Sequence, residues 1–343
     1  MYDYLIVTHI PAFYKINLYN ELSKKLKIFV IFIASNTNEK RADDFVILEK
    51  VKFEYQVLFD GNFQDRNVIN NIWELKKILK KIAFRKLLLS GWDLKEFWYL
   101  VMFYPKSKNF LALESTILES TPNGIKGWIK KLFLSRISTV FASGNLHIEL
   151  LKALNFRGNI KITKGVGIIN KPTFEKVRKG YQKRFLYLGR VSRVKNLEIL
   201  IKVFNDLPNY RLTLVGDGEE KEYLQSIANQ NISFKPPIEN IKLQNEFLNH
   251  DIFILPSISE PWGLVVEEAL YFGLPVMISK NCGSVELVKN AVNGYVFEPG
   301  DSEEIKSLIL GINGSLYEKL LEGVCKFSVD EKDLKQLGVY FAN

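Results

Sequence analysis

The sequence predicts an α/β protein made of two doubly wound domains, each a parallel sheet with helices on both faces. Two observations predict this class. The chain has 343 residues, which is enough for two domains with separate cores. Short apolar segments also alternate with amphipathic segments of about ten residues, a pattern typical of right-handed βαβ units. The composition, 47% hydrophobic and 25% charged, is that of a globular protein.

The alternation is clearest in the second half of the chain. Strands are expected there at 184–188, 211–215, 231–234, 251–255, 275–279 and 294–297, and helices at 196–206, 219–229, 240–249, 264–272, 283–290 and 302–311. The first half predicts strands at 3–7, 28–33, 86–90, 109–113, 138–141 and 159–162, and helices at 15–26, 67–82, 93–103, 124–135 and 145–154. Glycine and proline between Gly165 and Pro172 indicate an interdomain connection. We therefore expect domains at 1–164 and 165–314, followed by a segment at 315–343.

The most informative stretch is DIFILPSISEPWGLVVEEALYFGLP at 251–275. A buried strand ends at Pro256, a polar loop carries Glu260, and a helix begins near Leu264. Such a helix start exposes backbone N–H groups at the positive end of the helix dipole, which favours an anion at the carboxyl edge of the sheet. The N–H groups concerned belong to Gly263, Leu264 and Val265. Glu268 follows inside the helix, so carboxylates flank a predicted phosphate site.

A second cationic segment follows the first strand of the second domain. Gly189 permits a tight turn there, and Arg190 and Lys195 lie in the loop before a helix that Asn196 is expected to cap. Two cations beside helix amides suit a diphosphate, because arginine binds it bidentately and lysine acts as a point charge. Taken alone, such charges are better explained as solvated loop residues.

The string E-P-W-G-L-V-V-E-E-A-L, followed by G-L-P-V, resembles the Glu-x7-Glu signature of the retaining glycosyltransferases of family 4, which have the GT-B fold. The resemblance implies a nucleoside diphosphate sugar as donor, UDP in preference to GDP. Glu260 would then bind hydroxyls of the transferred hexose or N-acetylhexosamine, and Glu268 the ribose. Trp262, Gly263 and Leu264 would shape the pocket, and Arg190 and Lys195 would stabilise the leaving diphosphate. It also implies that 315–343 returns to the first domain.

Weaker parallels to the family lie elsewhere. Gly216, in the turn after the second strand of the donor domain, and Ile238, in the loop after the third, match positions near the nucleotide. The first domain departs from the family, since it has neither the glycine-rich loop after the first strand nor the later histidine. His9 and Glu114 occupy these two places. Either could contact the acceptor, and either could be a structural residue.

Charge and composition limit the partners. The formal net charge of +9 is compatible with nucleic acid, anionic lipid or a phosphorylated substrate, but no nucleic-acid motif with interleaved aromatic residues is present. No cofactor or metal is expected, because the three histidines and two cysteines have no ligand spacing. The absence of an apolar span and of a signal segment predicts a cytoplasmic protein, peripheral on the inner face of the cell membrane.

Two basic amphipathic segments suggest that membrane contact. In 73–86 and 125–136, apolar residues recur at helical spacing beside lysines, as in helices that lie on anionic lipid. The same pattern describes ordinary surface helices packed on a sheet. The acceptor is accordingly predicted to be a surface glycan on a lipid diphosphate carrier. The alternatives are a transferase for a soluble acceptor, a GT-B nucleotide-sugar epimerase, or, from another class, a basic nucleic-acid-binding protein.

Overall fold

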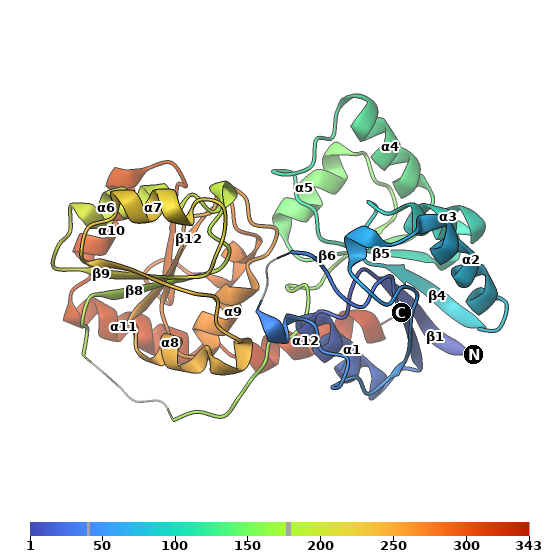
Figure 1. The fold of residues 1–343 in the computed structure, drawn as a ribbon, viewed down its shortest axis with the longest axis horizontal. Helices are drawn as coiled ribbons and strands as arrows, with labels where there is room; N and C mark the ends of the chain where they lie inside the picture. The colour runs from blue at the N-terminus through green and yellow to red at the C-terminus, as the bar shows by residue number, and fades with distance from the viewer. Residues whose placement is uncertain (40–41, 176–179, 343) are drawn as a thin grey trace. The chain divides into compact units, whose positions relative to one another are not determined.

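The computed structural model describes residues 1–39, 42–175 and 180–342, and the chain divides into two compact units (Figure 1). The first unit consists of Met1–Glu39, Phe45–Ile168 and Asp333–Asn343, and the second of Lys40–Asp44 and Ile169–Lys332. The second unit therefore extends beyond residue 314, the end expected from the sequence, and includes a short segment from the first half of the chain. Within the described ranges, no helix is long and apolar enough to cross a membrane.

The first unit is built on a seven-stranded parallel sheet with the order β3-β2-β1-β4-β5-β6-β7. Its strands are β1 (Tyr2–Thr8), β2 (Ile28–Phe32), β3 (Glu54–Val57), β4 (Phe84–Leu89), β5 (Asn109–Leu113), β6 (Thr139–Ala142) and β7 (Asn159–Ile162). Its helices are α1 (Phe13–Ser23), α2 (Val68–Leu79), α3 (Lys95–Phe103), α4 (Gly124–Ser135) and α5 (Asn145–Ala153). The chain runs outward in both directions from β1, which lies between β2 and β4.

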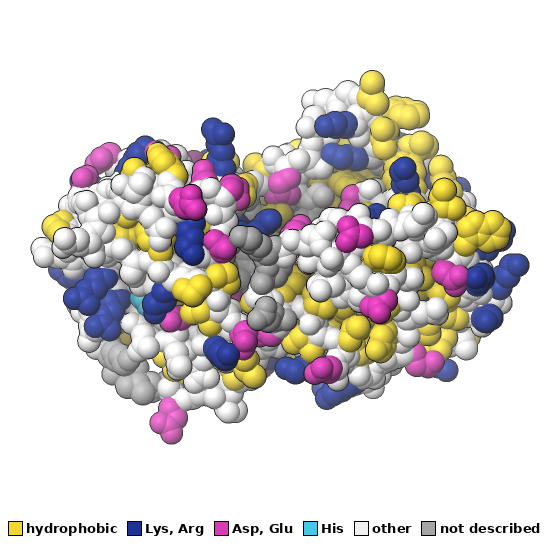
Figure 2. Space-filling model, in the orientation of Figure 1, with side chains coloured by type: hydrophobic (Ala, Val, Ile, Leu, Met, Phe, Trp, Pro, Cys, Tyr) yellow, Lys and Arg dark blue, Asp and Glu magenta, His cyan; other side chains and the backbone are white. Residues whose placement is uncertain are grey.

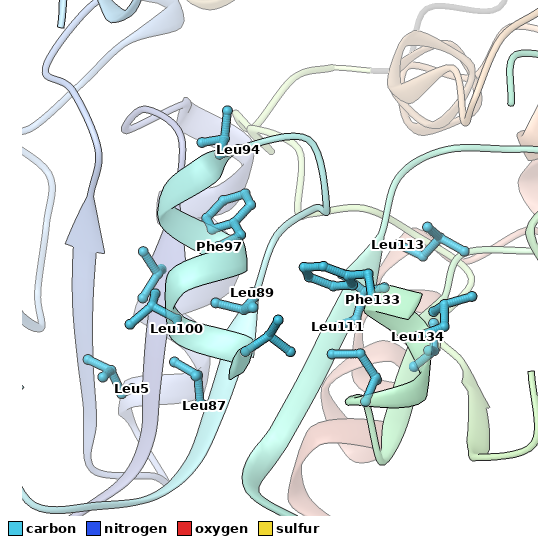
Figure 3. Close-up of a cluster of buried hydrophobic side chains, with 14 of the residues drawn as sticks. Leu5, Leu87, Leu89, Leu94, Phe97, Leu100, Leu111, Leu113, Phe133 and Leu134 are labelled. Atoms are coloured by element: carbon cyan, nitrogen blue, oxygen red, sulfur yellow. The ribbon is translucent and has the colours of Figure 1, made fainter. Parts of the chain in front are cut away.

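Strand alternation in β1 produces two cores, one on each face of this sheet. Leu5 and Val7 point into one cluster, and Tyr4 and Ile6 into the other, as the two-residue period of a strand requires. On the first face, Phe97 and Leu100 of α3 and the preceding N-cap residue Leu94 lie beside the leucines of β4 (Figure 3). On the second face lies α1, together with two residues of α12 (Val329–Phe341), Leu337 and Tyr340.

The second unit has a six-stranded parallel sheet with the order β10-β9-β8-β11-β12-β13. The strands are β8 (Arg184–Leu188), β9 (Arg211–Val215), β10 (Ile232–Lys235), β11 (Ile252–Leu255), β12 (Val276–Ser279) and β13 (Gly294–Phe297). The α-helices are α6 (Leu197–Asn205), α7 (Lys221–Ile227), α8 (Gln244–Leu248), α9 (Leu264–Tyr271), α10 (Ser302–Gly311) and α11 (Gly314–Cys325). In this sheet the direction in which successive strands are added reverses at β8, which lies between β9 and β11.

Two parallel sheets covered by helices confirm the predicted fold class. Three local predictions were wrong. β3, with the sequence EYQV, was missed because its largely exposed side chains show no apolar run. The helix expected at 240–249 is divided into a 3₁₀ turn, η5 (Asn240–Lys242), and α8. The helix expected at 283–290 is only a 3₁₀ helix, η6 (Gly283–Leu287).

Candidate functional site

The loops at the carboxyl edge of the second sheet are joined by backbone hydrogen bonds. Gly189 donates to the Val215 carbonyl at 3.1 Å, and Gly216 donates to the Lys235 carbonyl at 3.0 Å. A Cβ atom on Gly216 would lie 1.9 Å from the carbonyl oxygen of Gly189, so only glycine fits there. The loops that follow β8, β9 and β10 therefore form one continuous edge.

A pocket that is partly open to solvent lies along this edge. Its position beside β8 is the switch point at which doubly wound sheets bind nucleotides. Six residues that the sequence predicted line it, namely Gly189, Arg190, Gly216, Ile238, Val265 and Glu268. The sequence missed other lining residues, among them Ala42, Asn240 and Leu243. Lys195, Glu260, Trp262, Gly263 and Leu264 are not among the lining residues.

The start of α9 has the expected form. Gly263 is the N-cap with φ 86°, a left-handed conformation that favours glycine, and no side chain caps the helix. A Cβ atom at Gly263 would lie 3.2 Å from Ser284 Oγ, and that buried hydroxyl has no hydrogen-bond partner among the described residues. A buried hydroxyl beside an uncapped helix start fits an oxygen-rich ligand.

Lys195 and Glu260, to which the sequence assigned separate roles, form an ion pair. Their side chains are only 13% and 15% exposed, so the pair is poorly screened by water. The backbone of Glu260 is fixed to the turn before η6, because Gly283 N donates to the Glu260 carbonyl at 2.9 Å. Before any ligand binds, the Glu260 carboxylate therefore neutralises the Lys195 ammonium.

Asn196 does not cap α6 as predicted. It adopts a left-handed conformation (φ 56°) and makes no side-chain cap hydrogen bond. Its amide nitrogen instead donates to the Pro299 carbonyl at 2.5 Å. Asn196 therefore ties the loop after β8 to the loop after β13.

Trp262 is 2% exposed, and its indole Nε1 donates to Glu267 Oε1 at 2.6 Å. The other oxygen of Glu267 accepts from Lys332 Nζ at 2.5 Å. Both partners of this ion pair are buried. Glu267 is therefore a structural residue, and only the backbone of Trp262 remains to shape a ligand site.

Glu268 lines the pocket and is 8% exposed. Burial raises the pKa of its carboxyl from 4.5 to about 8, and the negative charges of Glu267 and Asp44 act in the same direction. The carboxyl is therefore largely protonated at neutral pH when the pocket is empty, and it can donate as well as accept a hydrogen bond.

This pKa makes the stability of the second unit depend on pH. The folded state holds the Glu268 proton more tightly than the unfolded state, so the contribution of this group to stability is highest below the unfolded pKa of 4.5 and falls as pH rises to about 8. Glu268→Gln should remove that slope. The variant should gain thermal stability relative to the parent between pH 5 and pH 8.5, whereas the exposed control Glu222→Gln should change little. Parallel curves for parent and Glu268→Gln would contradict the assignment.

A polar network lies at the carboxyl ends of β1, β4 and β5 in the first unit. His9 Nε2 is 2.9 Å from Asp93 Oδ2, and His9 Nδ1 is 3.3 Å from Ser90 Oγ. Although burial raises the pKa of Asp93, the hydrogen bond and charge of His9 hold it below its ordinary value. Asp93 and Ser90 were not predicted from the sequence.

Glu114 belongs to the same network. Its carboxylate is 2.7 Å from Lys15 Nζ, and Lys15 also donates to Thr8 Oγ1 at 3.2 Å. Burial lowers the pKa of Lys15, but Glu114, Tyr14 and Tyr19 together outweigh burial, and the pKa is raised. Thr8 Oγ1 also accepts from Ser90 at 2.9 Å, so the structure brings the predicted pair, His9 and Glu114, to one sheet edge. Among the residues that the structure describes, no group of three His, Cys, Asp or Glu side chains could hold a metal ion.

The comparisons with known proteins agree with this architecture. Residues 170–312 match the family model of glycosyl transferases group 1. Over 123 residues, which make up 35% of its length, the chain is 33% identical to the sulfoquinovosyl transferase SQD2 of Arabidopsis thaliana. This match covers 24% of that protein. The chain covers between 24% and 42% of the length of the first three curated relatives that it matches.

Solved structures resemble the whole chain. Alr3699/HepE of Anabaena, in complex with UDP and glucose, has a TM-score of 0.75 at 16% identity, with both chains fully covered. The lipopolysaccharide outer core galactosyltransferase WaaB has a TM-score of 0.68 at 15% identity, with 99% of each chain covered. At such identities the likeness shows the fold alone. This likeness and the two parallel sheets show a two-domain GT-B fold, and the match to glycosyl transferases group 1 covers residues 170–312 of the second unit.

Proposed function

We propose that this protein is a retaining glycosyltransferase that moves a hexose or N-acetylhexosamine from a UDP-sugar to a glycan acceptor. The observation that carries the proposal is the pocket at the switch point of the second sheet, lined by Arg190, Gly216 and Glu268. Its glycine-lined edge allows a diphosphate to approach backbone amides. The structure of Alr3699/HepE with UDP and glucose supports a nucleotide-sugar donor.

The chemistry would rest on charge stabilisation. As the sugar–phosphate bond breaks, negative charge develops on the leaving diphosphate, and Arg190, Lys195 and the start of α9 supply the opposing positive charge. One preorganised donor of this kind contributes about 3 kcal/mol to transition-state stabilisation. Glu260 would bind the sugar hydroxyls, and in doing so would release Lys195 from their ion pair for the diphosphate. Because these groups supply the charge, we infer a reaction without a metal ion.

A donor panel tests the proposal directly. The purified chain is incubated with UDP-, GDP- and ADP-sugars, with and without EDTA, and release of nucleotide and thermal stabilisation are measured. We expect stabilisation by UDP-sugars, turnover that EDTA leaves unchanged, and a product that NMR shows to retain the anomeric configuration of the donor. No stabilisation by any nucleotide would overturn the proposal.

Arg190→Ala should weaken the binding of UDP at least tenfold and the binding of uridine less than threefold. The reason is that arginine binds phosphate through charge-assisted hydrogen bonds of the bidentate kind, each stronger than a neutral one. Titration calorimetry with both ligands measures the difference. Equal losses for uridine and UDP would show that Arg190 does not contact the phosphates.

For the acceptor, we propose a glycan on a lipid diphosphate, reached by docking of α4 on anionic lipid. The structure separates the two basic helices that the sequence treated alike. In α2, Leu75 and Ile78 are buried in the core, so this stripe has the ordinary structural role. In α4, by contrast, Phe133 is the buried member of the stripe, and the others are exposed: Ile125 by 80%, Trp128 by 63%, Ile129 by 42% and Leu132 by 37%.

Figure 2 shows apolar side chains gathered over α4. Lys126 and Lys131 are exposed on the same helix, whereas Lys130 donates to Ser120 Oγ at 2.6 Å and faces inward. An apolar stripe with a tryptophan, bordered by lysines, is the arrangement of helices that lie in a lipid interface. Each lysine near anionic lipid adds about 1 kcal/mol.

The combined variant Ile125→Ser, Trp128→Ser and Ile129→Ser should lose at least tenfold in binding to vesicles that contain phosphatidylserine. Binding of the parent should fall with salt and be weak on phosphatidylcholine vesicles. Cosedimentation measures both. The matched control, Ile69→Ser with Trp73→Ser, removes exposed apolar residues from α2 and should leave binding unchanged. Equal binding to neutral vesicles, or no loss in the α4 variant, would favour a soluble acceptor.

A further inference from the structure

The segment that ends in Asp44 precedes β3 in the chain, but it belongs to the second unit. The Asp44 carboxylate binds η5 with both oxygens. Oδ1 accepts from Asn240 Nδ2 at 3.0 Å, and Oδ2 accepts from the backbone N–H of Ile241 at 3.1 Å. Ala42, two residues earlier, lines the pocket together with Asn240. Asp44 thus joins this segment to the turn that follows β10.

This contact determines which way the Asn240 amide faces. An ionised carboxylate only accepts hydrogen bonds, so the amide nitrogen must face Asp44. The amide oxygen of Asn240 is then the polar atom that the side chain can offer to a ligand in the pocket. Its neighbours in the lining, Ala42, Pro237, Ile238 and Leu243, are apolar. A single acceptor beside apolar walls suits a flat heteroaromatic ring with an N–H group.

The lining residues that follow β8 are polar in a different way. Arg190 lies beside Gly189 in the loop after β8, where a diphosphate is proposed to bind, and β8 is separated by β9 from β10, which precedes Asn240. Glu268 lines the pocket as well, and the charge of Asp44 helps to raise its pKa. For a nucleotide with its phosphates at Arg190 and its ribose at Glu268, the lining that remains for the base is the apolar group around Asn240.

We propose that Asn240 recognises the nucleobase of the donor through its amide oxygen, which accepts a hydrogen bond from a ring N–H, and that Asp44 is the positioning residue that holds this amide. The proposal rests on the proposed function. Uracil (N3–H) and guanine (N1–H) carry such a ring N–H, whereas cytosine and adenine carry none. The site would therefore select uridine or guanosine diphosphates, and removal of the ring N–H hydrogen would weaken binding of the nucleotide.

The test compares UDP, CDP and N3-methyl-UDP by titration calorimetry on the full chain. The parent should bind UDP at least tenfold more tightly than either analogue, because both would leave the Asn240 oxygen unpaired. Asn240→Ala and Asp44→Ala should reduce that preference to less than threefold. Asp44→Asn, which keeps one accepting oxygen, should restore part of it. The control Asp206→Ala removes an exposed carboxylate of the second unit, paired with Lys306 at 2.7 Å, and should keep the full preference.

The outcomes separate this inference from the proposed function. UDP and N3-methyl-UDP bound equally by the parent, or a full preference kept by Asp44→Ala, would overturn the inference while leaving the transferase intact. If GDP proves to be the ligand, N1-methyl-GDP replaces the methylated uridine and the same variants decide. If UDP, GDP, ADP and CDP all fail to bind, the proposed function is overturned, and the inference with it. A thermal melt of each variant confirms that it is folded.

Discussion

Replacing Glu260 with glutamine is expected to lower the rate of sugar transfer by about a hundred- to a thousand-fold, the scale for loss of one preorganised group at a reacting centre. Glutamine has nearly the same shape, so its backbone contacts with the turn before η6 should persist. UDP should bind as tightly as before or more tightly, because Lys195 would no longer be neutralised by a carboxylate. Initial rates and UDP titrations on the same samples separate the two effects.

A matched control is available in the same unit. Glu298 pairs with Lys280 at 2.7 Å, and both side chains are 54% exposed. Glu298→Gln should therefore leave both rate and affinity within twofold. A Glu260→Gln variant with normal turnover would show that Glu260 does not contact the transferred sugar. A parallel fall in UDP affinity would mean that Glu260 supports the pocket itself.

The largest effect on stability is expected at Lys332. Lys332→Met should destabilise the second unit by about 3–5 kcal/mol, the usual result of removing one partner from a buried ion pair. Glu267, whose side chain is fully buried, would lose the ammonium group of Lys332 and keep its hydrogen bond from the Trp262 indole. Urea unfolding followed by tryptophan fluorescence reports this, since Trp262 lies at the pair.

Two further variants sharpen this test. Lys306→Met breaks a pair with Asp206 in which the side chains are 28% and 63% exposed, so a loss below about 1 kcal/mol is expected. Lys332→Met combined with Glu267→Gln removes both charges and should recover part of the lost stability. If the Lys332 and Lys306 variants lost equal amounts of unfolding free energy, burial would not explain the contribution of the Lys332–Glu267 pair to stability.

The fold was predictable because its strands carry apolar runs that no other element explains. RFLYL and RLTLV occur as β8 and β9 with the predicted bounds. NFLAL likewise matches β5, and the strand at 159–162 matches β7 although most of its residues are exposed. The wrong predictions concern elements whose sequences show no periodic apolar pattern. β3 is largely exposed, and η6 consists of small and mixed residues that do not extend a helix.

The candidate site was predictable in its residue types but not in its pairings. A strand, a glycine turn and a helix start are local features, so Gly189, Gly216 and Glu268 could be located from the sequence. The contact between Asp44 and Asn240 joins residues 196 positions apart, and no local pattern reveals it. The pairing of Lys195 with Glu260 across 65 positions is of the same kind. Long-range polar contacts depend on tertiary packing.

The ion pair between Lys195 and Glu260 has a consequence for the end of a catalytic cycle. A bound sugar would engage Glu260 and leave Lys195 to the diphosphate, but once the sugar has been transferred its hydroxyls no longer hold the carboxylate. Glu260 could then return to Lys195 and compete with the spent nucleotide for the same ammonium group. In an enzyme of the proposed kind, this competition would promote release of the nucleotide product. Both residues would bind the intact donor. After transfer, the re-formed ion pair would weaken the binding of the nucleoside diphosphate product.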